Sequence, residues 1–533
     1  MTQGRRNFGR WRAVTLTAVY LAMGLHIAHW RIAGKTLAPL ELNELMVTLE
    51  LGIVTAGFLF MATVVLATLV FGRFFCSWAC HILALQDLCA WLMQRVHIRP
   101  KPVHSRLLPF LPTVAMSYMF LWPQAGRLAR GEGLPKLHVQ AHADPWASFV
   151  TDDFWRNLPG PWITTITFLV CGFAIVYFLG SRSFCNNVCP YGAIFGLADR
   201  FAPGRLVVEG DCTSCGRCTA VCQSGVVVHE ELQRFGKVVD PACLKDLDCV
   251  AACPTGGLRF GFTTPALFSS WKSKGRARRK FHFSRGEEVQ LALVVIASIL
   301  VFRGLYSSVP FLLSLAIATL LAYGSVLCVR LLRGDDVSLR GRSLRTAGRL
   351  TAHGRRFVPA AIVVTLFVGH SAFIRYHEVL GERAFASLRQ ALGARDKETF
   401  TRVLPEALSH LSACARWGLW RPLDLHRGLA ALYPYSATPE RAEPHLAHLV
   451  AVDPGDHGAR IRLARTLIET GRIAEAAEHV ERLYATPDLQ GGERTGAARA
   501  CLALAERYEA RSAGDVASLW RTRAERLGDP TRP

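Results

Sequence analysis

Seven apolar stretches alternate with charged loops over the first 373 residues of the chain. They cover residues 11–30, 45–72, 107–122, 161–180, 289–302, 310–332 and 357–373. A helix of about 20 apolar residues spans the hydrocarbon core of a bilayer. The third stretch is short, and Pro109 and Pro112 interrupt its apolar pattern. The pattern predicts a mainly α-helical membrane protein with about seven transmembrane helices.

Basic residues gather in alternate loops between these stretches. Residues 272–285 hold seven basic residues and no acid, and residues 330–356 hold eight arginines against two aspartates. The loop 123–160 instead balances four basic residues with four acidic ones. Because basic loops stay in the cytoplasm, we predict a cytoplasmic N-terminus and an extracytoplasmic C-terminus. The net charge of +21 follows from these loops, so we expect membrane lipid and no nucleic acid as a partner.

The segment 375–533 has a different pattern, rich in Ala, Leu and Arg with helical periodicity. Four of its residues match the register of a tetratricopeptide repeat: Leu463, Ala464, Gly471 and Ala476. Pro454 and Pro487 are separated by nearly one repeat period. An ordinary helical bundle is the alternative. Repeats of this kind stack into concave surfaces, so we expect an α-helical repeat domain that binds a protein partner.

Two cysteine runs follow the fourth apolar stretch. The first is Cys212, Cys215, Cys218 and Cys222, and the second is Cys243, Asp246, Cys249 and Cys253 followed by Pro254. This spacing is that of bacterial ferredoxins with two [4Fe–4S] clusters, in which the fourth cysteine of each run ligates the other cluster. We therefore assign one cluster to Cys212, Cys215, Cys218 and Cys253, and the second to Cys222, Cys243, Asp246 and Cys249. These thiolates require a reducing compartment, in agreement with a cytoplasmic location.

Asp246 stands where the second run should have a cysteine. A carboxylate is a harder ligand than a thiolate and holds iron less firmly in a sulfur cage. The second cluster is thus [4Fe–4S] with an Asp or water ligand, or [3Fe–4S]. Zinc bound by paired CxxC motifs is the alternative, but zinc takes four ligands per site, and two interlocked runs fit clusters better.

A second pair of motifs follows the second and fourth apolar stretches. Three residues separate Cys76 from Cys80, and three separate Cys185 from Cys189. A similar short sequence precedes each pair, and these two repeated phrases begin at Gly72 and Gly180. Four thiolates on one membrane face suffice for a third cluster. A redox dithiol, another soft-metal site and cysteines that merely pack are the alternatives.

Twin CxxxC(P) motifs after transmembrane helices, followed by a two-cluster ferredoxin segment, resemble the polyferredoxin-type membrane iron–sulfur family. This family includes the membrane iron–sulfur proteins of nitrous-oxide and periplasmic nitrate reductase systems and a cytochrome oxidase accessory protein. The resemblance covers residues 11–262 and implies a bacterial inner membrane location. It departs from the family pattern at His81, where the first motif lacks its proline, at Asp246, and in the repeat-bearing tail.

Three histidines fall within predicted spans. His26 and His29 lie in the outer half of the first span, and His370 lies in the outer half of the seventh. An ionisable residue inside a membrane is a functional hypothesis by default, here haem ligation or quinone binding. The alternative is interfacial histidines that bond to neighbouring groups.

These expectations combine into four domains. A membrane region with the twin motifs covers residues 1–204, and an inserted cytoplasmic α+β ferredoxin domain covers residues 205–262. A basic linker with three further spans follows over residues 263–374. The helical repeat domain covers residues 375–533. We predict an electron-transfer protein that connects a cytoplasmic or quinol donor with a membrane or extracytoplasmic partner complex. An assembly or redox-sensing factor for a respiratory metalloenzyme is the alternative. The sequence contains no nucleophile or acid–base constellation of an active site, so any enzymatic role is that of an electron-transfer component.

Overall fold

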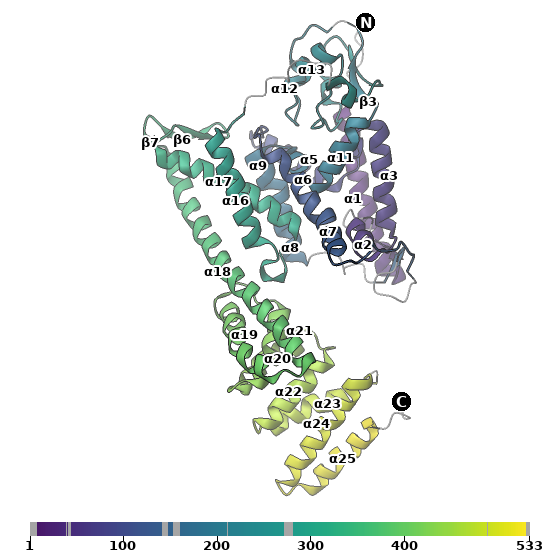
Figure 1. The fold of residues 1–533 in the computed structure, drawn as a ribbon, viewed down its shortest axis with the longest axis vertical. Helices are drawn as coiled ribbons and strands as arrows, with labels where there is room; N and C mark the ends of the chain where they lie inside the picture. The colour runs from purple at the N-terminus through teal and green to yellow at the C-terminus, as the bar shows by residue number, and fades with distance from the viewer. Residues whose placement is uncertain are drawn as a thin grey trace. The chain divides into compact units, whose positions relative to one another are not determined.

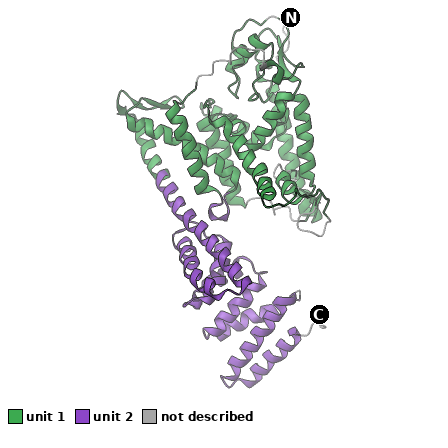
Figure 2. Ribbon diagram, in the orientation of Figure 1, with its two compact units in different colours: residues 1–303, 310–364 green, residues 304–309, 365–533 purple. Residues whose placement is uncertain are grey.

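Helices form most of the protein in the computed structural model, which describes residues 8–38, 40, 44–140, 148–152, 160–210, 212–270, 281–487 and 489–528 (Figure 1). The chain divides into two compact units (Figure 2). One unit comprises Met1–Arg303 with Pro310–Val364, and the other comprises Gly304–Val309 with Thr365–Pro533. The predicted topology uses the seven basic residues of the loop 272–285, and six of these lie outside the described residues.

Four helices in the described part of the chain are long and apolar enough to cross a membrane. They are α1 (Phe8–Ala33), the helix Pro161–Leu179, α17 (Phe311–Arg333) and α18 (Ala352–Ala394). Only 6% of the apolar window of α1 and 11% of that of α18 is buried within the protein. Such unpaired apolar surface is stable against lipid. These helices correspond to the first, fourth, sixth and seventh predicted stretches, and α18 continues past the predicted end at residue 373.

The second predicted stretch forms two helices, α2 (Glu44–Leu51) and α3 (Ala56–Phe71), and not a single continuous one. Gly52 has a φ of +78°, and a Cβ at this position would lie 2.3 Å from the carbonyl oxygen of Lys136. The backbone of Gly52 and Val54 bonds instead to His138, which lies far away in the sequence. This distant pairing breaks the helix at a glycine that tolerates the turn.

The third predicted stretch is helical although it contains two prolines. It comprises η1 (Leu108–Phe110), α6 (Leu111–Met116), η2 (Ser117–Leu121) and α7 (Trp122–Ala129). Pro109 and Pro112 stand at the starts of η1 and α6, where the backbone N–H has no helical partner to lose. The fifth stretch is α16 (Arg285–Phe302), which begins at a capping box formed by Ser284 and Glu287.

The cysteine runs lie in a small α+β fold. β3 (Gly204–Val208) pairs antiparallel with β4 (Leu258–Phe262), and Gly204 faces Phe262 while Val208 faces Leu258. Three short helices lie between the strands: α12 (Arg217–Ala220), α13 (Val228–Phe235) and α14 (Asp248–Ala251). The strand pair therefore brings the two ends of the segment that carries the cysteine runs together.

Short helices and strands complete this unit. The helix Pro161–Leu179 comprises α8 (Pro161–Thr167), η3 (Phe168–Ala174) and α9 (Ile175–Leu179). Further helices are α4 (Phe74–Trp78), α5 (His81–Arg95), α10 (Ser183–Asn187), α11 (Pro190–Phe201) and α15 (Ala266–Ser270). β1 (Thr36–Leu37) pairs with β2 (Val150–Thr151), and β5 (Val337–Leu339), β6 (Arg342–Thr346) and β7 (Arg349–Leu350) form a small sheet.

The second unit is a series of helices after α18 and includes the turn η4 (Leu305–Ser307). Its helices are α19 (Lys397–Trp417), α20 (Leu423–Leu432), η5 (Tyr433–Tyr435), η6 (Pro439–Arg441), α21 (Ala442–Val452), α22 (His457–Glu469), α23 (Ile473–Tyr484), α24 (Gly491–Glu509) and α25 (Gly514–Gly528). Leu463, Ala464 and Ala476 are buried between them, and Gly471 turns the chain from α22 to α23 with a φ of +83°. The residues in the predicted repeat register are thus the ones that pack the helix pair.

Candidate functional site

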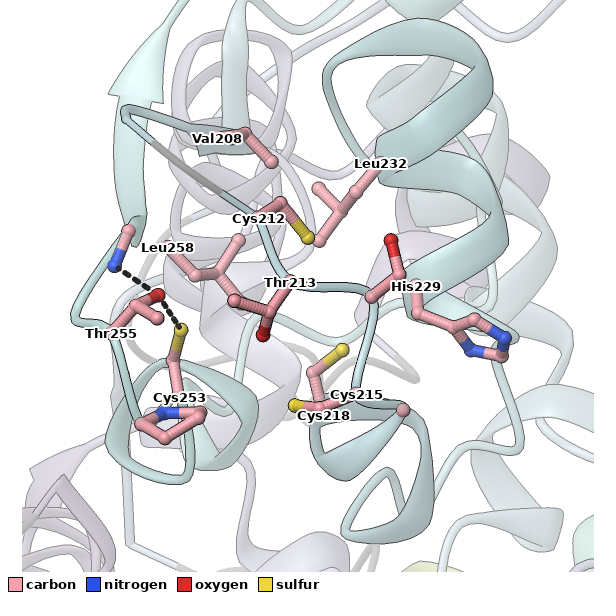
Figure 3. Close-up of a pocket in the computed structure, with 14 residues that line it drawn as sticks. Val208, Cys212, Thr213, Cys215, Cys218, His229, Leu232, Cys253, Thr255 and Leu258 are labelled. Carbon is pink, nitrogen blue, oxygen red and sulfur yellow. Dashed lines mark hydrogen bonds between the residues drawn. The ribbon is translucent and has the colours of Figure 1, made fainter.

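The first predicted ligand set surrounds an open cavity. Cys212, Cys215, Cys218 and Cys253 line a hollow of about 400 Å³, a volume that includes its solvent-open mouth. Figure 3 shows their sulfur atoms around this common space. Cys212 and Cys215 are exposed, and the other two are half-buried. The structure therefore brings together the four cysteines that the sequence assigns to one cluster.

Cys253 is held in place by its neighbours. The side-chain oxygen of Thr255 lies 3.5 Å from Cys253 Sγ and accepts a hydrogen bond from the backbone of Gly257 at 3.4 Å. Partial burial opposes the charge on Cys253, but hydrogen bonds from Thr255, Gly257 and Leu258 outweigh it and bring the pKa of this thiol below its usual value. The loop after the second run thus stabilises a thiolate at the edge of the cavity.

The second predicted ligand set is buried. Cys243, Asp246 and Cys249 are each less than a tenth exposed, and Cys222 is half-buried. Burial raises the pKa of Cys222 to about 12, and the neighbouring charges of Asp246 and Cys243 act in the same direction. Burial also raises the pKa of Cys243 to about 11. These groups are near one another and remain thiolates only when a cation compensates their charge.

The two cysteine loops share an unusual backbone. Ser214 and Gly216 have φ values of +54° and +72° on either side of Cys215, and Gly216 precedes α12. Lys245 and Leu247 have φ values of +55° and +63° on either side of Asp246, and Leu247 precedes α14. Left-handed backbone at a lysine and a leucine carries strain that the surrounding structure must impose. Asp246 therefore occupies in the second loop the position that Cys215 occupies in the first.

The twin motifs repeat the same local structure. α3 and α9 each end at a glycine with positive φ, +74° at Gly72 and +108° at Gly180. A five-residue helix with the first cysteine follows, and the second cysteine then precedes α5 or α11 directly. The turn at Gly180 leaves no space for a side chain, since a Cβ would lie 2.7 Å from Pro102 Cα. The glycines that open the repeated phrases are thus required by the two turns.

The structure places the four cysteines of the twin motifs in a single packed group. Cys76 and Cys185 are buried in one apolar cluster, and Cys80 and Cys189 pack against it. Arg73 donates to the carbonyl oxygen of Cys185 at 3.2 Å, which connects the two motifs across the repeat. Four cysteines from two helix pairs therefore belong to one packed cluster.

The donor set suits iron–sulfur clusters. Among the described residues, no three Cys, His, Asp or Glu side chains converge as ligands of a single metal ion do. The ligands of a cubane bind separate iron atoms at separate corners, so they stand around a volume without converging on one point. The hollow lined by Cys212, Cys215, Cys218 and Cys253 has this arrangement.

A buried ion network connects the twin motifs to the cysteine runs, and the sequence alone does not reveal it. Asp199 of α11 is completely buried and forms ion pairs with Lys245 and, at 2.9 Å, with Arg205. It also accepts a hydrogen bond from the backbone of Arg73 at 3.1 Å. Burial opposes the charge of Asp199, but Lys245 and Arg205 outweigh it and lower the pKa of this carboxyl.

Further hydrogen bonds join the Cys243 loop to the first twin motif. Trp78, between Cys76 and Cys80, donates to the carbonyl oxygen of Lys245 at 3.0 Å. Arg73 donates to the carbonyl oxygen of Pro241 at 2.8 Å. One sequence signal for these contacts was the arginine that both repeated phrases share. Arg73 and Arg182 each stand directly before a helix that carries a cysteine.

Arg12 of α1 makes a similar connection. It donates to the carbonyl oxygen of Asp246 at 3.1 Å, to the carboxylate of Asp248 at 3.0 Å and to that of Asp87 at 3.2 Å. Asp87 also pairs with Arg182. Ion pairs between buried arginines and half-buried aspartates thus connect the first helix, both twin motifs and the second cysteine run.

The histidines in the spans bond to nearby polar groups. His26 bonds to the carbonyl oxygen of Leu37 and His29 to the hydroxyl of Thr36, both at 2.9 Å. His370 bonds to the carbonyl oxygen of Trp417 at 2.9 Å in the other compact unit. These contacts agree with the alternative of satisfied interfacial histidines, and a haem or quinone role remains a prediction.

Comparison with known families matches both types of motif. A family described as a 4Fe-4S binding domain matches residues 53–99 and again 162–208, so the two halves of the predicted repeat match the same family. A 4Fe-4S dicluster domain matches residues 211–258. A tetratricopeptide repeat matches residues 437–486, which contain α21, α22 and α23. No solved structure matches the chain.

Three curated relatives each match less than half of the chain. The methylamine utilization ferredoxin-type protein MauN of Methylobacillus flagellatus is 28% identical over 37% of this chain and 66% of its own length. The ferredoxin-type protein NapH of Haemophilus influenzae is 25% identical over 36% of this chain and 61% of its own length. Protein NirI of Paracoccus denitrificans is 25% identical over 45% of this chain and 34% of its own length.

The chain thus spans less than two thirds of the length of these relatives. The four long apolar helices among the described residues nevertheless indicate a membrane protein, and the cysteine motifs and the relatives indicate iron–sulfur binding. The first half of the chain thus contains 4Fe-4S binding domains and resembles membrane proteins of the polyferredoxin type, and a tetratricopeptide repeat matches its C-terminal part.

Proposed function

We propose that this protein transfers electrons through iron–sulfur clusters between a cytoplasmic or quinol donor and a membrane or extracytoplasmic partner complex. The observation that carries the proposal is the cavity in which Cys212, Cys215, Cys218 and Cys253 meet, since these are the ligands that the ferredoxin spacing predicts. The names of the ferredoxin-type relatives support the same function.

The protein holds its clusters with three ligand sets. One is Cys212, Cys215, Cys218 and Cys253, the second is Cys222, Cys243, Asp246 and Cys249, and the third is Cys76, Cys80, Cys185 and Cys189. A cubane supplies one-electron transfer when bound, and burial and hydrogen bonds from the chain set its potential. Asp246 makes the second site the one with a carboxylate, water or vacant corner.

The contacts support an order of these sites. Cys212 and Cys215 are exposed and suit an aqueous donor. The loop that carries Cys243 is buried and bonds to Arg73 and Trp78, which belong to the first twin motif. These contacts support an order in which the Cys222 set passes electrons between the solvent-facing set and the twin motifs.

The topology completes the proposal. Seven crossings give a cytoplasmic N-terminus and ferredoxin domain and an extracytoplasmic tail, in agreement with the basic loops. The helical repeats of the tail offer a concave surface for a partner protein. His26, His29 and His370 are candidates for a quinone or haem site on the outer side.

Metal content tests the ligand sets. We expect anaerobically purified protein to contain about twelve irons for three cubanes, or about eleven when one is [3Fe–4S]. A Cys76→Ser, Cys185→Ser double variant should lose about four irons. Cys89→Ser is the matched control, because Cys89 is a buried cysteine outside all three sets and its loss should leave the iron content unchanged.

Reduction kinetics test the function itself. Protein in nanodiscs should be reduced by a quinol, or by a reduced soluble ferredoxin, within the time of respiratory turnover. Clusters that stay oxidised with both donors, in a protein that binds a respiratory metalloenzyme tightly through its tail, favour the assembly or sensing role instead.

A further inference from the structure

The loop between α19 and α20 presents three large apolar side chains. Trp417 is 55% exposed, Leu419 is 70% exposed and Trp420 is 54% exposed. Arg416 and Arg421 flank them. Gly418 forces the turn, since a Cβ there would lie 2.5 Å from the carbonyl oxygen of Cys414. The backbone thus displays two tryptophans and a leucine together, each more than half exposed among the described residues.

Two hydrogen bonds tie this loop to elements at the end of apolar helices. The carbonyl oxygen of Trp417 bonds to His370, which lies in the apolar part of α18. The backbone N–H of Leu419 donates to the hydroxyl of Tyr306 at 3.1 Å. Tyr306 belongs to the short connection 304–309 between the apolar helices α16 and α17. Both partners therefore fix the loop where apolar helices begin or end.

Tyr306 is itself bonded to α18. Its backbone N–H donates to the buried carboxylate of Glu378 at 2.8 Å, and Glu378 pairs with Arg375 at 3.3 Å. Arg375 and Glu378 follow the apolar part of α18 directly. The change from apolar to charged residues along α18 thus occurs next to the loop.

Aromatic residues gather at this level of α18. Phe373 is 44% exposed and Tyr376 is 60% exposed, only a few residues after His370. Tryptophan and tyrosine are enriched where a membrane meets water, because one part of each ring system is apolar and the other polar. Arginines at this depth extend their charged ends to the headgroups.

We propose that residues 416–421 form a membrane-interface anchor, in which Trp417, Leu419 and Trp420 insert among the lipid headgroups beside α18. Continuity with the apolar surface of α18 selects lipid as the occupant, since the exposed side chains extend a surface that already faces the bilayer. The anchor holds the start of the tail at the membrane, while α21 to α25 remain available to a partner protein. This inference requires α18 to lie in a membrane and is independent of the cluster assignments.

Tryptophan fluorescence in nanodiscs tests the anchor. Full-length protein and a Trp417→Phe, Trp420→Phe variant are compared in ordinary lipid and in lipid brominated near the carbonyl end of the acyl chain. The signal lost on substitution belongs to the two loop tryptophans. Bromolipid should reduce this difference signal at least about twofold, as expected for indoles at the interface. Energy transfer to clusters is the same in both lipids and cancels.

Trp520 provides the control, because it is 4% exposed in α25, far along the tail. The difference signal of Trp520→Phe should not respond to bromolipid. Equal iron contents and elution profiles show that the conservative variants fold. Quenching of the loop signal by aqueous acrylamide but not by bromolipid overturns the proposal, because the loop then faces water. Protection from both quenchers overturns it too and indicates a protein partner or a second copy. Failure to enter nanodiscs refutes the membrane location instead.

Discussion

Asp246 is the structural counterpart of Cys215. Each residue stands between two residues of left-handed backbone, and the second of these directly precedes the short helix that carries the next cysteine of the run. Lys245 and Leu247 adopt this strained conformation without being glycine, so the second loop keeps the shape of a ligand loop. The substitution of cysteine by aspartate has changed the ligand and not the backbone that presents it.

Asp246→Cys should therefore complete a second four-cysteine site. A thiolate holds its iron more firmly than a carboxylate, so we expect the variant to resist loss of that iron on mild oxidation. The measurement is EPR of anaerobic protein before and after ferricyanide, in which a [3Fe–4S] signal should be weaker than in the wild type. Cys215→Asp is the matched exchange and should create the same lability in the first site. A [3Fe–4S] signal that is unchanged in Asp246→Cys contradicts the assignment of Asp246.

The grouping of cysteines around one cavity was predictable from the sequence because it depends on local spacing. Cys212, Cys215 and Cys218 lie in one tight loop, so their spacing alone brings them to one cavity. The apolar helices were predictable for a similar reason, since composition over about 20 residues decides membrane insertion. The TPR match at residues 437–486 likewise confirms a repeat signalled by period and register.

The remaining features depend on partners distant in the sequence. The break at Gly52 results from pairing with His138, and the apolar pattern on both sides gives no sign of it. The sequence around Asp199 is typical of a surface acid at the end of an amphipathic helix. In the fold, however, Asp199 is buried together with Lys245 and Arg205. The histidines of the spans bond to Leu37, Thr36 and Trp417, contacts that no periodicity encodes.

Asp199→Asn should destabilise the contact between the twin motifs and the second cysteine run. The substitution leaves Lys245 and Arg205 buried without their counter-charge, which typically costs about 3–5 kcal/mol. We expect the temperature at which cluster absorbance is lost to fall clearly. Glu230→Gln is the control, because the partly exposed pair of Glu230 with Arg234 should contribute less than about 1 kcal/mol. Equal melting of both variants means that the ion network contributes nothing.

The same carboxyl predicts a dependence on pH. The pKa of Asp199 is lowered in the folded protein, so its contribution to stability is fully present above the pKa of an unfolded aspartate. This contribution is lost as the pH falls through the lower, folded pKa. The difference in cluster-loss temperature between wild type and Asp199→Asn should therefore be constant near neutral pH and shrink in acid. A difference that grows with acidity has the wrong sign for this network.

Gly180→Ala should damage the second twin motif more than a glycine substitution elsewhere in the membrane helices. The φ of +108° strains any side chain, and the new Cβ would lie 2.7 Å from Pro102 Cα and 2.8 Å from the carbonyl oxygen of Lys101. Backbone strain of this type costs on the order of 1–3 kcal/mol, and the contact adds to it. We expect loss of the iron held by Cys185 and Cys189, measured as iron content per protein after anaerobic purification.

Gly24→Ala is the matched control for this substitution. Gly24 lies within α1, where the added Cβ has no neighbour within 4 Å and the backbone is helical. Alanine is the better helix former, so this variant should keep the iron content and the yield of the wild type. If both variants retain all their iron, the positive φ at Gly180 is not needed to present Cys185, and the repeated turn is only a connection. Selective loss in Gly180→Ala shows instead that the turn positions the ligands of the twin motif.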